Sequence, residues 1–519
     1  MAQPHILKPY ERRGEPGLFQ RIALGFGLVV LAVFYGLMCL VLPMQMLVIP
    51  AVPILLGIGM ILWLLPDAGG VKEEWIGSAL LAYVAFNALW PSYMAVNLSG
   101  LPWISPTRIA LFSLLAAAIL NFATSAELRT KINEAVWTLP WLARAFWLFW
   151  ATTVVALVIS VDPMSSLTKF ANNQIYWTLM FGFSCWLASR EGYADRFGKI
   201  IAWTIIPVAL VAINEYRVGS VVWIPYLPGW LQSDPEIIAK VASFNGRAFT
   251  NEYRARGTFG GSLYFAEYLA LAFPFVLHLW SQSKKLYQSV LMMMAVVAVA
   301  TTMVFTGSRS AALAVLLSPI LLIFLTAWRT RQIESRSLVA SAALFSYPAL
   351  AGVMATLVIF WRRLHVMIIG GGQHQGSTDA RDIQWAMGWP KIFARPLGHG
   401  AATSGGVLGF YNGGSEMPTV DSYFLTLLLE YGFVGLFAFI AMLFLAMWYG
   451  WQGYNRTRRT DMLVLAPLIV ALFNFTIIKA VSSTEGSLPI VFIMMGCIVG
   501  IMAQQQRADR LQGDGPPPP

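Results

Sequence analysis

About fourteen continuous apolar segments run along this chain, and most approach the roughly 20 residues that a helix needs to cross a bilayer. Continuous apolar runs favour helices, because a membrane barrel alternates polar and apolar residues along each strand. Of all residues, 57% are hydrophobic and 12% are charged, whereas soluble domains have about 25% charged residues. We therefore predict an all-α polytopic membrane helix bundle with about 12–14 transmembrane helices, forming one integral membrane domain over residues 1–519. The apolar segments lie at residues 22–42, 47–65, 75–95, 107–122, 143–161, 172–188, 198–215, 262–280, 287–305, 310–327, 338–360, 423–448, 462–479 and 486–504.

The basic residues between these segments predict the orientation of the chain. Lys and Arg precede the first segment, which ends without a cleavage site and is typical of a retained signal anchor. Alternate short loops are also basic, as cytoplasmic loops are. This orientation places two long hydrophilic stretches, 217–261 and 361–422, on the outer side, which is the periplasm if the membrane is a bacterial inner membrane. The Pro-rich tail, 505–519, is then cytoplasmic and predicted to be disordered.

The three cysteines, Cys39, Cys185 and Cys497, all lie within apolar segments and form no Cys-x-x-Cys pair. This pattern is typical of small buried side chains, so we expect neither a disulfide framework nor a metal site. No cofactor is expected either. The net charge of +10 is spread over the loops, and we expect membrane lipids rather than nucleic acid as partners.

Some predicted apolar segments begin at the outer face of the membrane and end at the inner face. Polar residues gather just before the starts of these segments. The free N–H groups and the partial positive charge of such helix ends favour anions. Arg254 and Arg256 precede the segment at 262–280, Ser308 and Arg309 precede the one at 310–327, and Asp421 precedes the one at 423–448. Arginine forks match phosphate geometry, so these positions predict a site for a phosphorylated ligand at the outer face.

Each of these residues also has a structural interpretation. Arg309 can extend to lipid headgroups, Arg381 can pair with its acidic neighbours, and Asp421 can be a helix N-cap. Glu267 and Glu430 differ, because they lie within apolar segments, where a carboxylate is costly and usually faces a polar cavity.

The second half of the chain, residues 254–435, resembles the bacterial O-antigen ligase and O-antigen or exopolysaccharide polymerase family. The resemblance rests on four motifs in order. They are Arg256-Gly257-Thr258-Phe259 leading into Ala266-Glu267-Tyr268-Leu269, then Gly307-Ser308-Arg309, then Arg381 to Trp385 followed by Gly398-His399-Gly400, and last Asp421 to Leu425 followed by Glu430-Tyr431-Gly432 and Gly435. Asp421 stands where ligases of the family carry His.

The resemblance implies a GT-C-like fold and a metal-independent glycosyltransferase of lipopolysaccharide or exopolysaccharide biosynthesis. Such an enzyme moves a glycan from undecaprenyl diphosphate to an acceptor hydroxyl, with inversion. Arg254, Arg256, Arg309 and Arg381 would then bind the diphosphate, and Glu267, Ser308 and Glu430 would support them. Asp421 would take the proton of the acceptor, with His399 as the alternative base.

Within this class we predict a polymerase that joins lipid-linked oligosaccharide repeats, with a chain-length regulator as a candidate partner. The alternatives are a ligase that transfers the glycan to lipid A core or to protein, and a transporter or flippase of the same lipid-linked sugar. The sequence leaves open the sugar, the linkage, the acceptor, the chain length and the oligomeric state.

Overall fold

The computed structural model describes residues 73–97, 103–232, 235–243, 253–361, 375–411 and 417–513. The predicted apolar segments at 22–42 and 47–65, with Cys39, lie outside these ranges. The predicted all-α polytopic fold is confirmed, since nine helices within the described ranges are long and apolar enough to cross a membrane. They are α4 (Pro106–Thr124), α6 (Pro140–Val158), α9 (Tyr193–Val218), α11 (Ser262–Ser281), α12 (Leu286–Thr306), α13 (Arg309–Ile333), α18 (Tyr423–Arg456), α19 (Leu465–Lys479) together with the 3-10 turn Thr460–Val464 before it, and α20 (Leu488–Gly513).

Three other predicted segments also form helices. They are α3 (Glu73–Leu89), a π-helical turn (Gln174–Leu179) continuing into α8 (Met180–Leu187), and α14 (Leu338–Phe360). Among the described residues, extended backbone pairs only at isolated positions, such as Met94 with Gln232.

Helix α20 lies at the centre of the bundle, because 94% of its apolar stretch is buried. It packs against α8, α18 and α19. Gly496 and Gly500 allow the close approach to α8, since a Cβ on either glycine would overlap with Ser184 or Ala188. Cys185 and Cys497 are buried and free, as predicted.

The C-terminal part of α20 differs from the expectation for the tail. Residues 505–513 were predicted to be disordered but continue the helix to Gly513. Three consecutive glutamines anchor this part, since Gln504 donates to the carbonyl of Ala188, Gln505 to that of Gly453 and Gln506 to that of Thr138. The apolar pattern ends before these residues, so it did not predict them.

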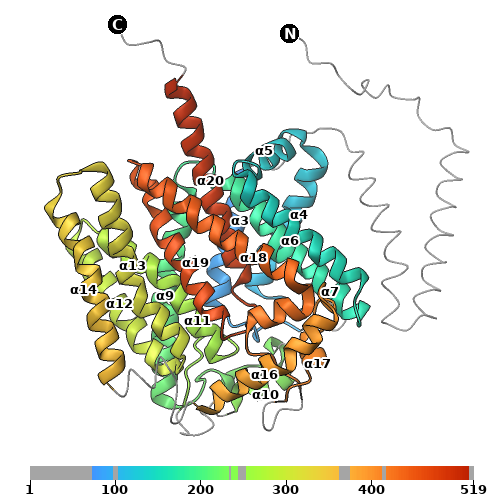
Figure 1. Cartoon of the computed structure of the whole chain (residues 1–519). Helices are drawn as coiled ribbons and strands as arrows, with labels where there is room; N and C mark the ends of the chain where they lie inside the picture. Colours follow the sequence, from blue (N-terminus) through green and yellow to red (C-terminus); the bar gives the residue numbers. More distant parts are fainter. Residues whose placement is uncertain are drawn as a thin grey trace, which may run out of the picture. The chain divides into compact units, whose positions relative to one another are not determined.

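The hydrophilic stretches also contain helices that their composition did not predict. The first holds α10 (Pro235–Ala242), and the second holds α16 (Gln375–Ala394) and α17 (Ser404–Leu408). Helices α5 (Ala126–Val136) and α7 (Pro163–Asn173) complete the set. In Figure 1, α10, α16 and α17 lie at the lower end of the bundle, and the C-terminal end of α20 projects from the opposite end.

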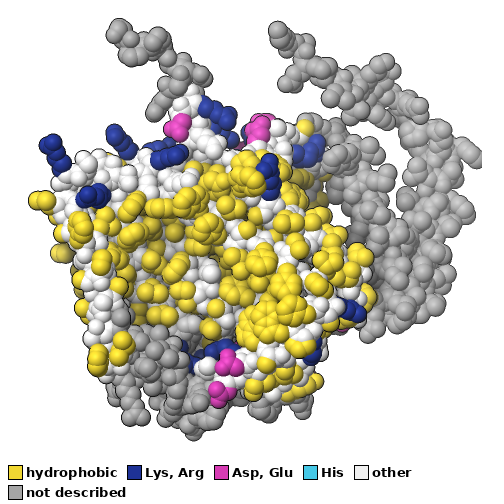
Figure 2. Space-filling model, in the orientation of Figure 1, with side chains coloured by type: hydrophobic (Ala, Val, Ile, Leu, Met, Phe, Trp, Pro, Cys, Tyr) yellow, Lys and Arg dark blue, Asp and Glu magenta, His cyan; other side chains and the backbone are white. Residues whose placement is uncertain are grey.

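Basic and hydrophobic side chains are distributed differently along the axis that joins these two ends of the bundle. In Figure 2, Lys and Arg side chains gather along the upper edge, while hydrophobic side chains cover the middle of this face. An apolar band bordered by basic residues is the pattern expected of a helix bundle in a bilayer with its basic loops on one side.

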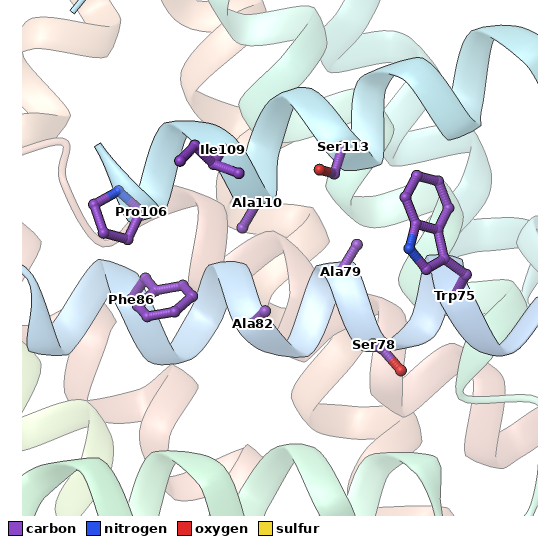
Figure 3. A pocket seen from close by; sticks show the side chains of 9 residues that line it. All are labelled: Trp75, Ser78, Ala79, Ala82, Phe86, Pro106, Ile109, Ala110 and Ser113. Carbon is purple, nitrogen blue, oxygen red and sulfur yellow. The ribbon is translucent and has the colours of Figure 1, made fainter. Parts of the chain in front are cut away.

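A groove of about 400 Å³ lies between α3 and α4. Figure 3 shows Trp75 at one end, Phe86 and Pro106 at the other, and small residues such as Ala79 and Ala110 between them. None of the residues predicted to form the site lines this groove. The polar residues gather elsewhere, around the start of α18.

Candidate functional site

Helix α18 begins at Tyr423, and the residues just before it carry the acidic group predicted from the sequence. Ser422 occupies the N-cap position, but its side chain makes no capping hydrogen bond. The first turn therefore has N–H groups that no side-chain cap satisfies. Asp421 precedes the N-cap, so the interpretation of Asp421 as the N-cap residue is wrong. We call residues 419–423 the α18 mouth.

Helix α16 packs against the first part of α18. This packing positions the residues of α16 that face the mouth. The contact is an apolar cluster of Ile392, Leu408, Leu425, Leu428 and Leu429. Gly388 lets the two helices approach closely, since a Cβ there would lie 2.8 Å from the Cδ1 of Leu425. Polar residues earlier on α16 are thereby held on a rigid helix.

Two of these polar residues face Asp421. The backbone N–H of Asp421 donates to Gln384 Oε1 at 2.8 Å, and the charge of Arg381 acts on the Asp421 carboxylate. Burial raises the pKa of Asp421 above its usual value, while Arg381 and Gln384 partly oppose the shift. A carboxyl whose pKa moves toward the working pH suits general base catalysis.

Helix α18 is interrupted nine residues after it begins. Gly432 has φ 68° and ψ −168°, a conformation open almost only to glycine. The backbone N–H of Phe433 donates to Pro396 O at 3.0 Å, and that of His399 donates to Leu429 O at 2.8 Å. The segment 396–400 is therefore bonded to the backbone on both sides of the break.

The break at Gly432 leads to a prediction about the stability of the protein. A Cβ at Gly432 would overlap with the backbone of Pro396 and Leu397, in a left-handed conformation. Gly432→Ala should therefore lower the free energy of unfolding by about 1–3 kcal/mol or more, measured by SDS-induced unfolding in mixed micelles. Gly406→Ala is the matched control, because nothing lies within 4 Å of its added Cβ. Equal stability of the two variants would contradict the described break.

His399, the alternative base, lies beside this break. Its Nδ1 is 3.1 Å from Leu429 O, a contact that holds a proton on Nδ1. Burial lowers the pKa of His399. At 1.5 Å rise per residue, Leu429 and Asp421 lie about 12 Å apart along the axis, so His399 and Asp421 serve two different positions.

Glu430 is buried in α18 and pairs with lysine on α7. Lys169 Nζ lies 2.9 Å from Glu430 Oε2 and 2.7 Å from Glu485 Oε1. Ser404 Oγ also donates to Glu430 Oε1 at 2.9 Å. Glu430 therefore faces a cation, where the sequence indicated a polar cavity.

Glu267 forms a second buried pair, with Lys479 of α19 at 2.7 Å. Thr484 and Ser487 also donate to its carboxylate. The segment 482–487 thus contacts Glu267 directly, while its Glu485 contacts the pair formed by Lys169 and Glu430.

The same segment reaches the α18 mouth. Ser483 donates to the carbonyl of Val420, and Lys479 Nζ lies 5.4 Å from the ring centre of Tyr423. Glu267 and Glu430 therefore belong to one network that borders the mouth.

Arg256 occupies a different environment, with a buried carboxylate of α9. Glu215 accepts from the backbone N–H of Arg256 at 3.1 Å and of Gly257 at 2.6 Å, and from Tyr253 Oη at 2.6 Å. The Arg256 Nε lies 3.9 Å from Glu215 Oε1. Glu215 thus holds the turn that carries Arg254 and Arg256.

Arg254 connects this turn to the start of α13. Its Nε donates to Thr306 O at 2.8 Å, two residues before Ser308. Ser308 is the N-cap residue of α13 but makes no side-chain capping bond, and Arg309 follows it. The turn at 254–256 therefore contacts the residues just before α13, although Arg254 and Thr306 are 52 positions apart in the sequence.

The predicted residues thus form two neighbourhoods. Arg381 and Asp421 meet at the α18 mouth, bordered by the network of Glu267 and Glu430, whereas Arg254 and Arg256 lie by Glu215 and the start of α13. Sequence reasoning missed Lys169, Gln384, Lys479, Glu485 and Glu215. Two of them had a signal, since Glu215 and Lys479 are charged residues at the ends of predicted apolar segments. Within the described ranges, no group of three or more His, Cys, Asp or Glu residues is placed to hold a metal ion.

Fold and site together define a multi-pass, all-helical membrane protein with charged residues around the start of one helix. The model of the O-antigen ligase family matches residues 294–440. This match confirms the resemblance predicted from the motifs and supports glycan transfer of the O-antigen ligase and polymerase type. It includes Arg309, Arg381, His399, Asp421 and Glu430, whereas Arg254, Arg256 and Glu267 precede it. No curated protein matches the chain.

Proposed function

We propose that the protein is a polymerase that joins lipid-linked oligosaccharide repeats at the periplasmic face of the inner membrane. The donor is a glycan on undecaprenyl diphosphate, and the acceptor is a sugar hydroxyl of another repeat. The observation that carries the proposal is the α18 mouth, where the half-buried carboxyl of Asp421 faces Arg381 and Gln384. The family match supports the same type of transfer.

In the proposed reaction, Asp421 and the arginines have different roles. The acceptor oxygen attacks the anomeric carbon, Asp421 takes its proton, and the diphosphate leaves with the electron pair of the broken C–O bond. Charge develops on the leaving diphosphate, and preorganised arginine forks stabilise that charge. Arg381 is the arginine nearest the base, and Arg254, Arg256 and Arg309 would hold the carrier's phosphates from the start of α13.

The orientation is part of the proposal. The basic edge at the end where α20 projects fits the cytoplasmic side. Helices α10, α16 and α17 lie at the other end, which would then face the periplasm.

Purified protein in liposomes tests the function. Supplied with the lipid-linked glycan from a strain that lacks the protein, the wild type should lengthen it. Arg381→Ala should abolish lengthening, and Arg196→Ala, an exposed arginine at the start of α9, should not. Gel mobility and mass of the glycan are the measurements.

Other products would identify other activities. Glycan moved to lipid A core would indicate a ligase, and label that crosses the bilayer without change in size would indicate a flippase. Full activity of Arg381→Ala would remove Arg381 from the site.

A further inference from the structure

Four buried polar atoms in or facing the α18 mouth lack a hydrogen-bond partner among the described residues. They are Arg381 Nε, Gln384 Nε2, Thr419 Oγ1 and Ser422 Oγ. Gln384 is 1% exposed and Ser422 is 2% exposed, and both adjoin Asp421. More than 90% of buried polar groups in folded proteins are paired, and an unpaired one costs about 1–3 kcal/mol. Unpaired donors beside the Asp421 carboxyl, Gln384 Nε2 and Ser422 Oγ, point to a bound group that pairs them.

The chemistry of Gln384 defines which end of its amide is free. The backbone N–H of Asp421 can only donate, so it requires the amide oxygen of Gln384, and the two meet at 2.8 Å. The amide nitrogen is therefore the end that makes no hydrogen bond of good geometry, although it lies close enough to the Asp421 carboxylate to oppose the rise in its pKa. Helix α16 fixes this position through Gly388 and Ile392, which pack against α18.

A donor beside a carboxylate is the complement of a hydroxyl group. A hydroxyl oxygen accepts a hydrogen bond and its proton donates one, so one hydroxyl can pair with the Gln384 amide and the Asp421 carboxylate at once. A phosphate oxygen pairs with the amide but is repelled by the carboxylate.

We infer that Gln384 binds the acceptor hydroxyl, donating from Nε2 to its oxygen while Asp421 receives its proton, with Ser422 Oγ as a second contact. This assignment rests on the proposed transfer reaction and deepens it, because it gives the acceptor its own binding residue. Gln384 aligns the oxygen lone pair that attacks the anomeric carbon, and an acceptor without the hydroxyl leaves the amide unpaired.

Two substitutions separate this role from a structural one. Gln384→Met removes both hydrogen bonds at nearly constant volume. Gln384→Glu keeps an oxygen for the backbone N–H of Asp421 but loses the amide donor. Gln288→Met is the matched control, because Gln288 lies on α12 and contacts Tyr287.

The assay varies lipid-linked acceptor at fixed labelled donor in liposomes, at alkaline pH where Asp421 is ionised in all variants. Binding of undecaprenyl diphosphate alone reports the donor side. We expect both Gln384 variants to raise the KM for acceptor about ten- to hundredfold, with unchanged binding of undecaprenyl diphosphate. Gln288→Met should match the wild type.

The outcomes distinguish this inference from the proposed function. A wild type that lengthens no glycan would refute the function itself. An active wild type with Gln384→Glu at normal acceptor KM would show that only the bond to the Asp421 backbone matters, and would overturn the inference. So would a loss of undecaprenyl diphosphate binding in both variants, since that places Gln384 on the donor side.

Discussion

Asp421→Asn should reduce glycan transfer by about 10²–10⁴-fold, the usual contribution of a general base, while the protein inserts normally and still binds undecaprenyl diphosphate. Asparagine keeps the size and polarity of the side chain but cannot take a proton. The backbone N–H of residue 421 can still donate to Gln384, and Ser422 remains the N-cap residue of α18. A loss of this size therefore reports chemistry rather than folding.

The pH dependence gives a second measurement of the same role. The base must be ionised, and burial raises the pKa of Asp421. Wild-type transfer should therefore fall as the pH is lowered through this raised pKa, whereas the residual activity of Asp421→Asn should lack that acidic limb. Initial rates of lengthening across pH, at saturating donor, test the expectation.

Asp162→Asn is the matched control. Asp162 is the N-cap residue of α7, and its side chain accepts from the backbone N–H of Ser165 at 3.2 Å. Asparagine caps as well as aspartate, so this variant should keep full activity. If Asp421→Asn behaves like Asp162→Asn, Asp421 is not the base, and His399 becomes the residue to test.

The membrane helices could be predicted from the sequence because each apolar run must satisfy its own backbone in lipid. The ends of α9, α11 and α12 fall within a few residues of the predicted segments. Helix α16 could not be predicted in this way, since it begins with polar residues and is not uniformly apolar. It nevertheless carries Arg381 and Gln384, and packing on α18 determines its position.

The site was predictable only in part, for a related reason. Motif order identified Arg381 and Asp421, but Gln384 was not singled out within the motif from Arg381 to Trp385, because its role depends on contact with residue 421. The partners of Glu267 and Glu430 come from α7, α19 and the segment 482–487, far away in sequence. A charged residue within an apolar segment is energetically costly, so its presence indicates that it has a partner. Only the fold shows which residue that partner is.

Lys479→Met should lower the free energy of unfolding by about 3–5 kcal/mol, the usual cost of leaving one charge of a buried pair without its partner. Lys479 is 0% exposed and Glu267 is 1% exposed, with 2.7 Å between Nζ and Oε1. SDS-induced unfolding in mixed micelles is the measurement. Lys199→Met is the matched control, since Lys199 forms a pair of similar length with Asp195 but is 50% exposed, and exposed pairs contribute about 0–1 kcal/mol.

The double variant Lys479→Met with Glu267→Gln separates the charge from the packing. Glutamine is neutral and can still accept from Thr484 and Ser487, so the double variant should regain most of the stability that Lys479→Met loses. A double variant as unstable as the single one would mean that Lys479 acts through its contacts with Tyr423 and Thr484 rather than by neutralising Glu267. The segment 482–487 joins this pair to the α18 mouth, because Ser483 donates to the carbonyl of Val420. Glycan transfer should therefore recover in the double variant only if this segment regains its wild-type contact with the mouth.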